Sequence, residues 1–461
     1  MAFPSSDSVA TPSSDLARFS SELRFDDIPA SVIKRTEELF LDWYASAVAG
    51  CGERPVKILH DFARTMGPKS GACQIFGSEE TTSPLFAAMV NGAASHVVEQ
   101  DDLHNLSISH PATVVFPPLF ALAQWDSTIS GKDFLTAAVA GYEACIRVGQ
   151  YLGRSHYRVF HMTATAGTVG AAMAASNLLK LDHGQTLNAL GSAGTQAGGL
   201  WEFLRDAADS KQLHTAKASM NGLQSAFIAQ AGFTAAKQII EGKQGMGAGM
   251  LAEGDENWIT DRLGERWAIV ETSFKFHASC RHTHPAADAL LELRNEHQFD
   301  YRNIRNIKAY VYQAAVDVLG AVTDPQTIHQ SKFSMGFVLA LIARYGRASV
   351  NDFTDAALAD EENRSLHDKV EMILDPIIDQ AYPGKWSARV NVTMDNGEAY
   401  ETTMEVPKGD PENTLSRDEL ADKALMLAQY GGVVSQTAMT QVIDTIWHLT
   451  EARSMAEAFS S

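Results

Sequence analysis

Carboxylate and imidazole side chains gather in one short stretch of the chain. Glu99, Asp101 and Asp102 stand beside His104, and His110 follows the second aspartate by eight residues. Side chains of these two kinds, carried on a loop between packed helices, are the groups that proton transfer uses. The same stretch would also fit a solvated acidic loop with an incidental histidine.

Two further segments place histidines next to groups that bind anions. His161 precedes an alanine-rich run together with Thr163 and Thr165, and hydroxyls at a helix start either bind anions or cap the helix. Lys211 and His214 are three residues apart, which puts them roughly on one face of a helix. A histidine beside lysine in an alanine-rich region favours a functional role over a solvated face.

The densest basic cluster lies after residue 268. Within ten residues it contains Lys275, His277, Cys280, Arg281, His282 and His284. Three histidines and a cysteine suggest a metal site, but their spacing matches no standard ligand set, and Pro285 starts a helix directly afterwards. We therefore expect no metal here and a site for anionic groups instead.

Hydrophobic spacing indicates the elements that must position these groups. Helical periodicity predicts helices over residues 31–49, 56–66, 82–98, 118–125, 131–152, 185–197 and 210–232. The prolines at 111, 117 and 118 predict irregular backbone directly after the acidic stretch. Residues 20–268 are therefore expected to be nearly all helix.

The pattern changes in the last part of the chain. Alternating apolar residues predict a strand over 303–316, and residues 388–406 predict a β-hairpin that turns at Asn396-Gly397. A buried helix is expected over 332–345, so the region 270–405 mixes helix and strand. Residues 417–429 and 434–457 return to helix and are expected to rejoin the first core.

Bulk composition narrows the class of protein. A chain of 461 residues exceeds what one core usually serves, so two domains are expected. The hydrophobic content of 45% and charged content of 20% are typical of a soluble globular protein. A net charge of −19 argues against nucleic-acid or anionic-membrane partners. A local cluster of cations can still bind an anionic substrate.

Cysteine usage and the first residues predict a cytoplasmic protein. The four cysteines form no CxxC pair, which favours reduced, buried thiols over a disulfide framework. Residues 1–15 are rich in Ser and Pro and lack the basic and apolar parts of a signal peptide. The longest apolar runs are too short to span a bilayer. We expect a disordered tail over residues 1–18.

The separated segments offer compatible chemistry. Lysines and free N–H groups would hold two or three substrate carboxylates, while a histidine or carboxylate takes a proton from the carbon beside one of them. Such a carbon acid is weak, so the developing enediolate needs preorganised positive charge. A second acid would protonate a leaving hydroxyl or return a proton to carbon.

Four motifs in this order resemble the MmgE/PrpD family, which includes 2-methylcitrate dehydratase, cis-aconitate decarboxylase and iminodisuccinate epimerase. They are NGAASHVVEQDD with SHPATVVFP, HMTATAGTVGAA, SKQLHTAKASMNG and FKFHASCRHTH. The resemblance runs over about residues 20–455. It implies a mostly α fold, with a large all-helical domain over 19–268 and 406–461 and a smaller α/β lid domain over 269–405. It also implies a homodimer, no metal, no cofactor and a site between the domains.

The resemblance implies roles for individual residues. It assigns catalysis to His110, His161, Lys211 and Lys275, and it places His214 beside Lys211; we add Asp102 as a further catalytic candidate. From their residue types and positions we expect substrate binding by Glu99, Asp101, His104, Thr163, Thr165, His214, His277 and Arg281. The family's decarboxylases carry a pattern like D-F-D-D-T before the histidine, whereas this chain has Glu99 at the first position and Leu103 at the last. Trp201 adds bulk just before the lysine motif.

These observations together predict a cofactor-independent lyase that acts on a small polycarboxylate. Dehydration of a 2-methylcitrate-like acid is the first choice. Epimerisation or decarboxylation of a related acid, of the iminodisuccinate or cis-aconitate type, is the alternative. An inactive carboxylate-binding homologue is a second alternative, although the lysines and histidines present at every motif position argue against it.

Overall fold

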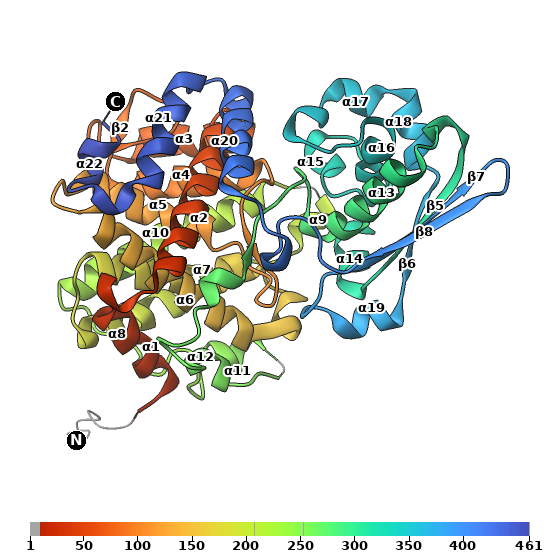
Figure 1. The fold of residues 1–461 in the computed structure, drawn as a ribbon. Helices are drawn as coiled ribbons and strands as arrows, with labels where there is room; N and C mark the ends of the chain where they lie inside the picture. The colour runs from red at the N-terminus through yellow and green to blue at the C-terminus, as the bar shows by residue number, and fades with distance from the viewer. Residues whose placement is uncertain (1–9, 207, 252, 461) are drawn as a thin grey trace.

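The computed structural model describes residues 10–206, 208–251 and 253–460. Figure 1 shows two bodies side by side: a larger one built of helices, and a smaller one in which helices pack on a sheet. The first and last parts of the chain both lie in the larger body. The mostly α fold with a smaller α/β part is thus confirmed, and we propose domains over 19–268 with 406–461, and over 269–405.

The larger body is a set of tightly packed helices. Its longer helices are α1 (Pro12–Glu22), α2 (Ala30–Gly50), α3 (Arg54–Met66), α4 (Pro84–Val97), α5 (Ala112–Trp125), α6 (Gly131–Tyr157), α7 (Met162–Leu178), α8 (His183–Gly194), α10 (Ser210–Gln230), α20 (Arg417–Gly431) and α21 (Gln436–Trp447). Its short elements are α9 (Phe203–Asp206), α11 (Met246–Met250), α12 (Asn257–Thr260), α22 (Met455–Ala458), β1 (Cys73–Gln74), β2 (Thr81–Thr82), β3 (Leu103–His104) and β4 (Thr272–Ser273).

Small residues allow the central helices to approach closely. A Cβ added at Gly170 of α7 would lie 2.6 Å from the Cβ of Cys145 on α6, and one at Gly222 of α10 would lie 2.3 Å from the Cβ of Ala171. Such distances are below any real carbon contact, so these crossings require glycine. Helices α5, α6, α8 and α10 pack around the wholly buried α7, which therefore forms the centre of this body.

The C-terminal helices return to the larger body, as expected. Helix α20 packs along α2, and its buried Lys423 donates to Asp42 Oδ1 at 2.6 Å. The same ammonium donates to the carbonyls of Gln100 and Lys275 at 2.7 and 2.8 Å. One buried cation thus fixes the acidic stretch and the start of the basic cluster to the C-terminal part of the chain.

The smaller body is built on a four-stranded sheet in the order β6-β5-β7-β8. Its elements are α13 (His284–His297), β5 (Ile304–Val311), α14 (Gln313–Leu319), α15 (Ile328–Ser331), α16 (Met335–Tyr345), α17 (Asp355–Ala359), α18 (Glu361–His367), β6 (Val370–Leu374), α19 (Pro376–Ala381), β7 (Ala388–Met394) and β8 (Ala399–Met404). The predicted hairpin is confirmed: β7 and β8 pair antiparallel, and Gly397 has φ +92°, which the Asn-Gly turn requires.

The prediction of irregular backbone after the acidic stretch is confirmed for residues 105–111 and wrong from Ala112 onward. Helix α5 begins at Ala112 and contains Pro117 and Pro118 in its interior. Proline at 117 removes the N–H that would bond the carbonyl of Thr113, and the hydroxyl of Ser219 on α10 donates to that carbonyl at 3.2 Å. A neighbouring helix therefore replaces part of the hydrogen bonding that proline removes.

Two further expectations differ from the structure. The tail expected over 1–18 is helical from Pro12, because the Thr11 hydroxyl accepts from Ser14 N and Leu16 is fully buried; residues 1–9 lie outside the described residues. The strand expected over 303–316 ends at Val311, and helix α14 follows it. The parallel strand β6 was not predicted, because its five residues are all partly or fully exposed and show no strong alternation.

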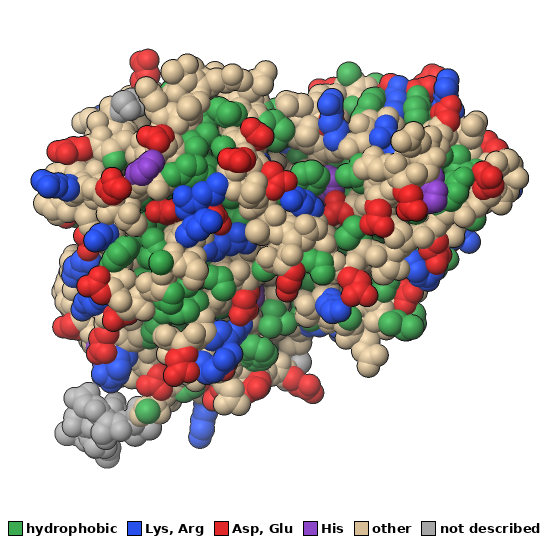
Figure 2. All heavy atoms as spheres, viewed as in Figure 1, with side chains coloured by type: hydrophobic (Ala, Val, Ile, Leu, Met, Phe, Trp, Pro, Cys, Tyr) green, Lys and Arg blue, Asp and Glu red, His purple; other side chains and the backbone are tan. Residues whose placement is uncertain are grey.

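The surface carries charges of both signs. Figure 2 shows acidic and basic side chains interspersed on the face drawn, together with scattered apolar side chains. Among the described residues, no helix combines the length and the apolar character needed to cross a bilayer.

Candidate active site

A small enclosed pocket of about 20 Å³ lies where the two bodies meet. From the larger body it is lined by residues that include Glu99, His110, His161 and Lys211. From the smaller body come Arg281, His282, Phe333 and Trp386. The structure therefore brings together five of the predicted site residues: Glu99, His110, His161, Lys211 and Arg281.

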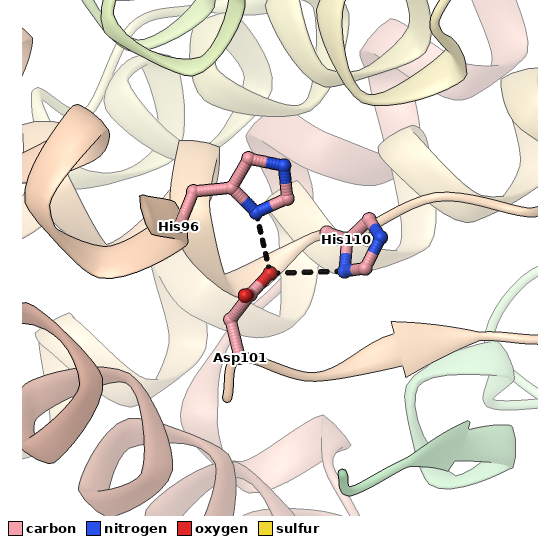
Figure 3. A group of neighbouring side chains, drawn as sticks. All are labelled: His96, Asp101 and His110. Atoms are coloured by element: carbon pink, nitrogen blue, oxygen red, sulfur yellow. Dashed lines mark hydrogen bonds and ion pairs between the residues drawn. The ribbon is translucent and has the colours of Figure 1, made fainter. Parts of the chain in front are cut away.

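Asp101 sets the orientation of two histidines. Its Oδ2 lies 2.8 Å from Nδ1 of His96, which projects from α4, and 2.9 Å from Nδ1 of His110 (Figure 3). Nδ1 of His110 also lies 2.6 Å from the carbonyl oxygen of Asp102. Because a carbonyl only accepts hydrogen bonds, this nitrogen must carry the proton. In neutral His110 the other ring nitrogen, Nε2, then carries a lone pair and no proton. Figure 3 shows Nε2 directed away from Asp101.

Burial keeps these imidazoles neutral while the carboxylate stays charged. Burial lowers the pKa of His110 and lowers that of His96 to about 4. Burial would raise the pKa of Asp101, but His96, Lys275 and His110 together hold it well below its usual value. The result is an ionised aspartate that supports a neutral imidazole base.

His96, Asp101 and His110 are close enough in space to hold a metal ion, since their facing atoms all lie within 4.8 Å of one another. A metal needs the Nδ1 lone pairs, yet the contact with the Asp102 carbonyl requires a proton on His110 Nδ1. Lys275 Nζ also lies 3.9 Å from the other Asp101 oxygen, which disfavours a divalent cation. The residues present fit a hydrogen-bonded cluster better than a metal site.

Glu99 joins the two predicted lysines. One of its oxygens pairs with Lys211 and the other accepts from Lys275 Nζ at 2.7 Å, and all three side chains are buried. Burial opposes the charge of Glu99, but the two ammonium groups hold its pKa well below the usual value. Glu99 has φ +58°, a conformation that costs a non-glycine residue on the order of 1–3 kcal/mol. Lys211 lines the pocket, whereas Lys275 lies behind Glu99.

Asp102 has an environment opposite to that of Asp101. Its Oδ1 accepts from the backbone N–H of Ala112 at 3.1 Å, and its Oδ2 accepts from the Tyr142 hydroxyl at 2.8 Å. Burial raises its pKa well above the usual value. Asp102 does not line the pocket. Its side chain bonds the first residue of α5, Ala112, and so holds the loop that carries His110.

His161 and Trp201 form another wall of the pocket. Nδ1 of His161 lies 3.1 Å from Nδ1 of His214, and its ring is 4.7 Å from the Trp201 ring. Among the described residues, its buried Nε2 has no hydrogen-bond partner. Burial and the neighbouring His214 hold the pKa of His161 well below its usual value. His161 thus offers the pocket a second neutral imidazole.

The other predicted residues support the pocket from behind. Thr163 accepts from His110 N at 3.1 Å, and Thr165 bonds His156 at 2.8 Å. His104 bonds Ser107 at 2.9 Å, and His277 pairs with Asp288 at 2.8 Å. None of these four predicted residues lines the pocket. Arg281 does, and its guanidinium pairs with Asp410.

Sequence reasoning missed several residues of the site. Tyr157 and Trp386 line the pocket, and His282 bonds Tyr312 at 2.9 Å while its ring stacks on Trp386. His96 was missed although it is the partner of Asp101. The only signal for His96 in the sequence was a histidine on an otherwise apolar helix, which more often marks a packed core residue.

Two family models match this chain. The model of the MmgE/PrpD N-terminal domain matches residues 14–258, and that of the MmgE/PrpD C-terminal domain matches residues 277–449. The first alone covers more than half of the chain. Together they include every predicted site residue except Lys275, which lies between the two matched ranges.

Curated relatives match over nearly the full length. A cis-aconitate decarboxylase-like protein, oryM, of Aspergillus oryzae is 29% identical over 96% of this chain and 95% of its own. A cis-aconitate decarboxylase of Aspergillus terreus is 27% identical over 94% and 92%, and that of Homo sapiens is 25% identical over 87% and 84%. These proteins are similar to the chain throughout both bodies.

Proposed function

Because this chain belongs to the MmgE/PrpD family, we propose that it is a cofactor-independent lyase acting on a small polycarboxylate. The proposed chemistry is proton transfer at the carbon next to a substrate carboxylate. The observation that carries the proposal is His110, whose Nδ1 proton is held by Asp101 and the Asp102 carbonyl. This leaves the Nε2 lone pair free to take a proton.

Positive charge is already in place for the anion that forms. Lys211 and Arg281 line the pocket, and Lys275 adds a third cation behind Glu99. When His110 Nε2 takes the proton, the electron pair left on carbon spreads into the neighbouring carboxylate. Preorganised cations stabilise this enediolate without reorganising at the moment of reaction.

Dehydration of a 2-methylcitrate-like acid is the reaction that a neutral base fits best. The carbon–hydrogen bond breaks toward His110, a double bond forms, and the carbon–oxygen bond of the neighbouring hydroxyl breaks. The leaving hydroxide needs one proton to depart as water. Tyr157 lines the same pocket, and its hydroxyl is the candidate donor.

The second candidate is decarboxylation of a cis-aconitate-like acid, which the names of the relatives favour. Here a carbon–carbon bond breaks, carbon dioxide leaves, and an acid delivers a proton to carbon. Glu99 and Leu103, the two departures from the decarboxylase pattern, both line the pocket. We therefore expect a substrate preference different from that of decarboxylases with the D-F-D-D-T pattern.

Proton NMR in D2O tests the proposal with EDTA-treated protein and a panel of 2-methylcitrate, citrate, cis-aconitate, malate-type acids and iminodisuccinate. New olefin from a hydroxy acid identifies dehydration, and carbon dioxide release identifies decarboxylation. Deuterium entry without either product identifies epimerisation. Binding of the panel without turnover or exchange would refute the proposed lyase and leave an inactive carboxylate-binding homologue.

A further inference from the structure

A much larger cleft adjoins the catalytic pocket. Its volume is about 820 Å³, against about 20 Å³ for the pocket, and both cavities are lined by Tyr157, Trp201 and Val318. The cleft lies between the end of α6, the segment around α9, and helices α14 and α19. A substrate that reaches the pocket is therefore in direct reach of the cleft.

The two volumes suit different parts of a ligand. The pocket has room for little more than one water molecule, which needs about 10–15 Å³. The cleft is in the range of about 300–1,000 Å³ that is typical of sites for drug-sized ligands. A small polycarboxylate would occupy a minor part of this space, so the cleft has the size for a substituent.

The lining of the cleft is apolar where it adjoins the pocket. Val159 and Leu200 lie at the cleft with 52% and 55% of their surface exposed, so their side chains are accessible to a ligand there. Leu204, Ala314 and Val318 extend this wall. Burying such side chains against a hydrocarbon chain is favourable.

The charges of the cleft are largely paired within it. Arg154 contacts Asp379 at 3.2 Å, and Arg205 contacts Glu202 at 3.4 Å; all four residues line the cleft. Asp317 adds a further negative charge and Arg158 a further positive one. With acids and bases balanced, the cleft offers no excess of cations for more carboxylates.

Polar groups without partners mark the junction and the far wall. Within the described residues, the buried indole N–H of Trp201 has no hydrogen-bond partner, and neither does the hydroxyl of Tyr382. Trp201 lines both cavities and can donate to a substrate carboxylate at their junction. Tyr382, 3% exposed, lines the cleft only.

We propose that the substrate is a polycarboxylate carrying an aliphatic chain, whose head lies where the pocket opens into the cleft while the chain lies in the cleft. This inference rests on the proposed function for the identity of the head. The chain passes Trp201 and Val318 and packs against Leu200, Leu204 and Ala314. Specificity for the chain then comes from the cleft rather than from the ionisable residues.

Titration calorimetry with unreactive dicarboxylates tests this separately from turnover. The probes are succinate, butylsuccinate and octylsuccinate, added to the full chain. Each methylene that enters the apolar cleft is expected to lower Kd roughly fourfold until the cleft is filled. Equal or weaker binding of octylsuccinate relative to succinate would overturn the inference.

Matched variants locate the chain. Ala314→Trp fills the cleft and is expected to weaken octylsuccinate at least tenfold while succinate stays within twofold. Ala356→Trp, at an exposed position of α17 outside the cleft, is the control and should change neither. If Ala314→Trp fails to fold, Leu200→Asp at its exposed position gives the same readout. An unchanged octylsuccinate Kd in the folded variant would contradict the placement.

The two proposals can fail independently. If unsubstituted acids are turned over but succinate, butylsuccinate and octylsuccinate bind with equal Kd, the proposed lyase activity is supported and the proposed chain site is refuted. A steep series without turnover of any acid, alkyl-substituted acids included, would retain the chain site and remove the lyase.

Discussion

Two groups of three histidines in this protein have different surroundings in the structure. The first comprises His96, His110 and His161 of the larger body, and the second comprises His277, His282 and His284 of the smaller body. In the first, two imidazoles line the pocket. In the second only His282 does, because His277 is bound to Asp288 and His284 accepts from Arg281 at 3.2 Å.

The difference shows that the partner of each imidazole matters more than the density of histidines. Asp101 takes the inner nitrogen of His110 and leaves the outer one to the pocket. Asp288 takes Nε2 of His277 on the inside of the smaller body. A histidine–aspartate pair thus forms a candidate base in the larger body, where it is His110–Asp101, and a structural contact in the smaller body, where it is His277–Asp288.

Replacing His110 is expected to have the largest effect. His110→Ala should lower kcat by about 10²–10⁴, since general acid–base groups contribute this much. The free energy of unfolding should also fall, by about 1–3 kcal/mol, because the buried ring bonds Asp101 and the Asp102 carbonyl; kcat is therefore measured where the variant is folded. The measurement is turnover of the substrate identified by NMR. A kcat within threefold of the wild type would remove His110 as the proton-transfer group.

The adjacent aspartates sharpen the comparison. Asp101→Asn removes the charge that fixes the His110 tautomer, so kcat should fall about 100-fold. Asp102→Asn should change kcat less than threefold, because the Asp102 side chain bonds Ala112 N and Tyr142 rather than an imidazole, and the variant keeps the backbone carbonyl that holds His110. Steady-state kinetics of both variants give the answer. Equal losses would show that the two carboxyl groups share one role.

Acidification is expected to destabilise both clusters. Burial lowers the pKa of His96 to about 4 and that of His282 to about 3, against about 6.5 in the unfolded chain. The unfolded state therefore binds more protons below pH 6.5. Stability is fully present above that pH and falls by up to about 1.4 kcal/mol per pH unit for each histidine.

Urea unfolding at pH 7, 6 and 5 measures this slope. The control is His448→Gln, since His448 is exposed and its pKa is raised by the neighbouring Asp444 carbonyl, so its loss should not flatten the curve. Stability that stays constant from pH 7 to pH 5 would show that His96 and His282 are protonated in the folded protein.

Much of the fold could be predicted because periodicity and turn chemistry are local signals. The hairpin followed from Asn396-Gly397, and the α4 and α10 helices from their apolar spacing. The interior prolines of α5 could not be placed in a helix, because the compensating Ser219 hydroxyl comes from a segment far away in sequence. Strand β6 gave no signal because its faces are similarly exposed.

The site was predicted in part for the same reason. Residue type and motif order identified His110, His161 and Lys211, which line the pocket. Asp101 and Asp102 are neighbours of one type, and only their tertiary surroundings shift their pKa values in opposite directions. Likewise, Lys275 was expected at the substrate, but the fold places Glu99 between it and the pocket.

The smallest expected effect separates the clusters most cleanly. His277→Gln keeps a hydrogen-bond donor for Asp288, which also accepts from Lys408 N at 2.7 Å, so the free energy of unfolding should fall by about 1 kcal/mol. Because His277 does not line the pocket, kcat and KM should stay within twofold. His282→Gln is the matched variant from the same cluster and should raise KM, since His282 faces the pocket beside Trp386. A loss of kcat in His277→Gln, together with a changed KM in His282→Gln, would show that both histidines contribute to the site. A carboxylate partner such as Asp288 would then not distinguish a structural histidine from a functional one.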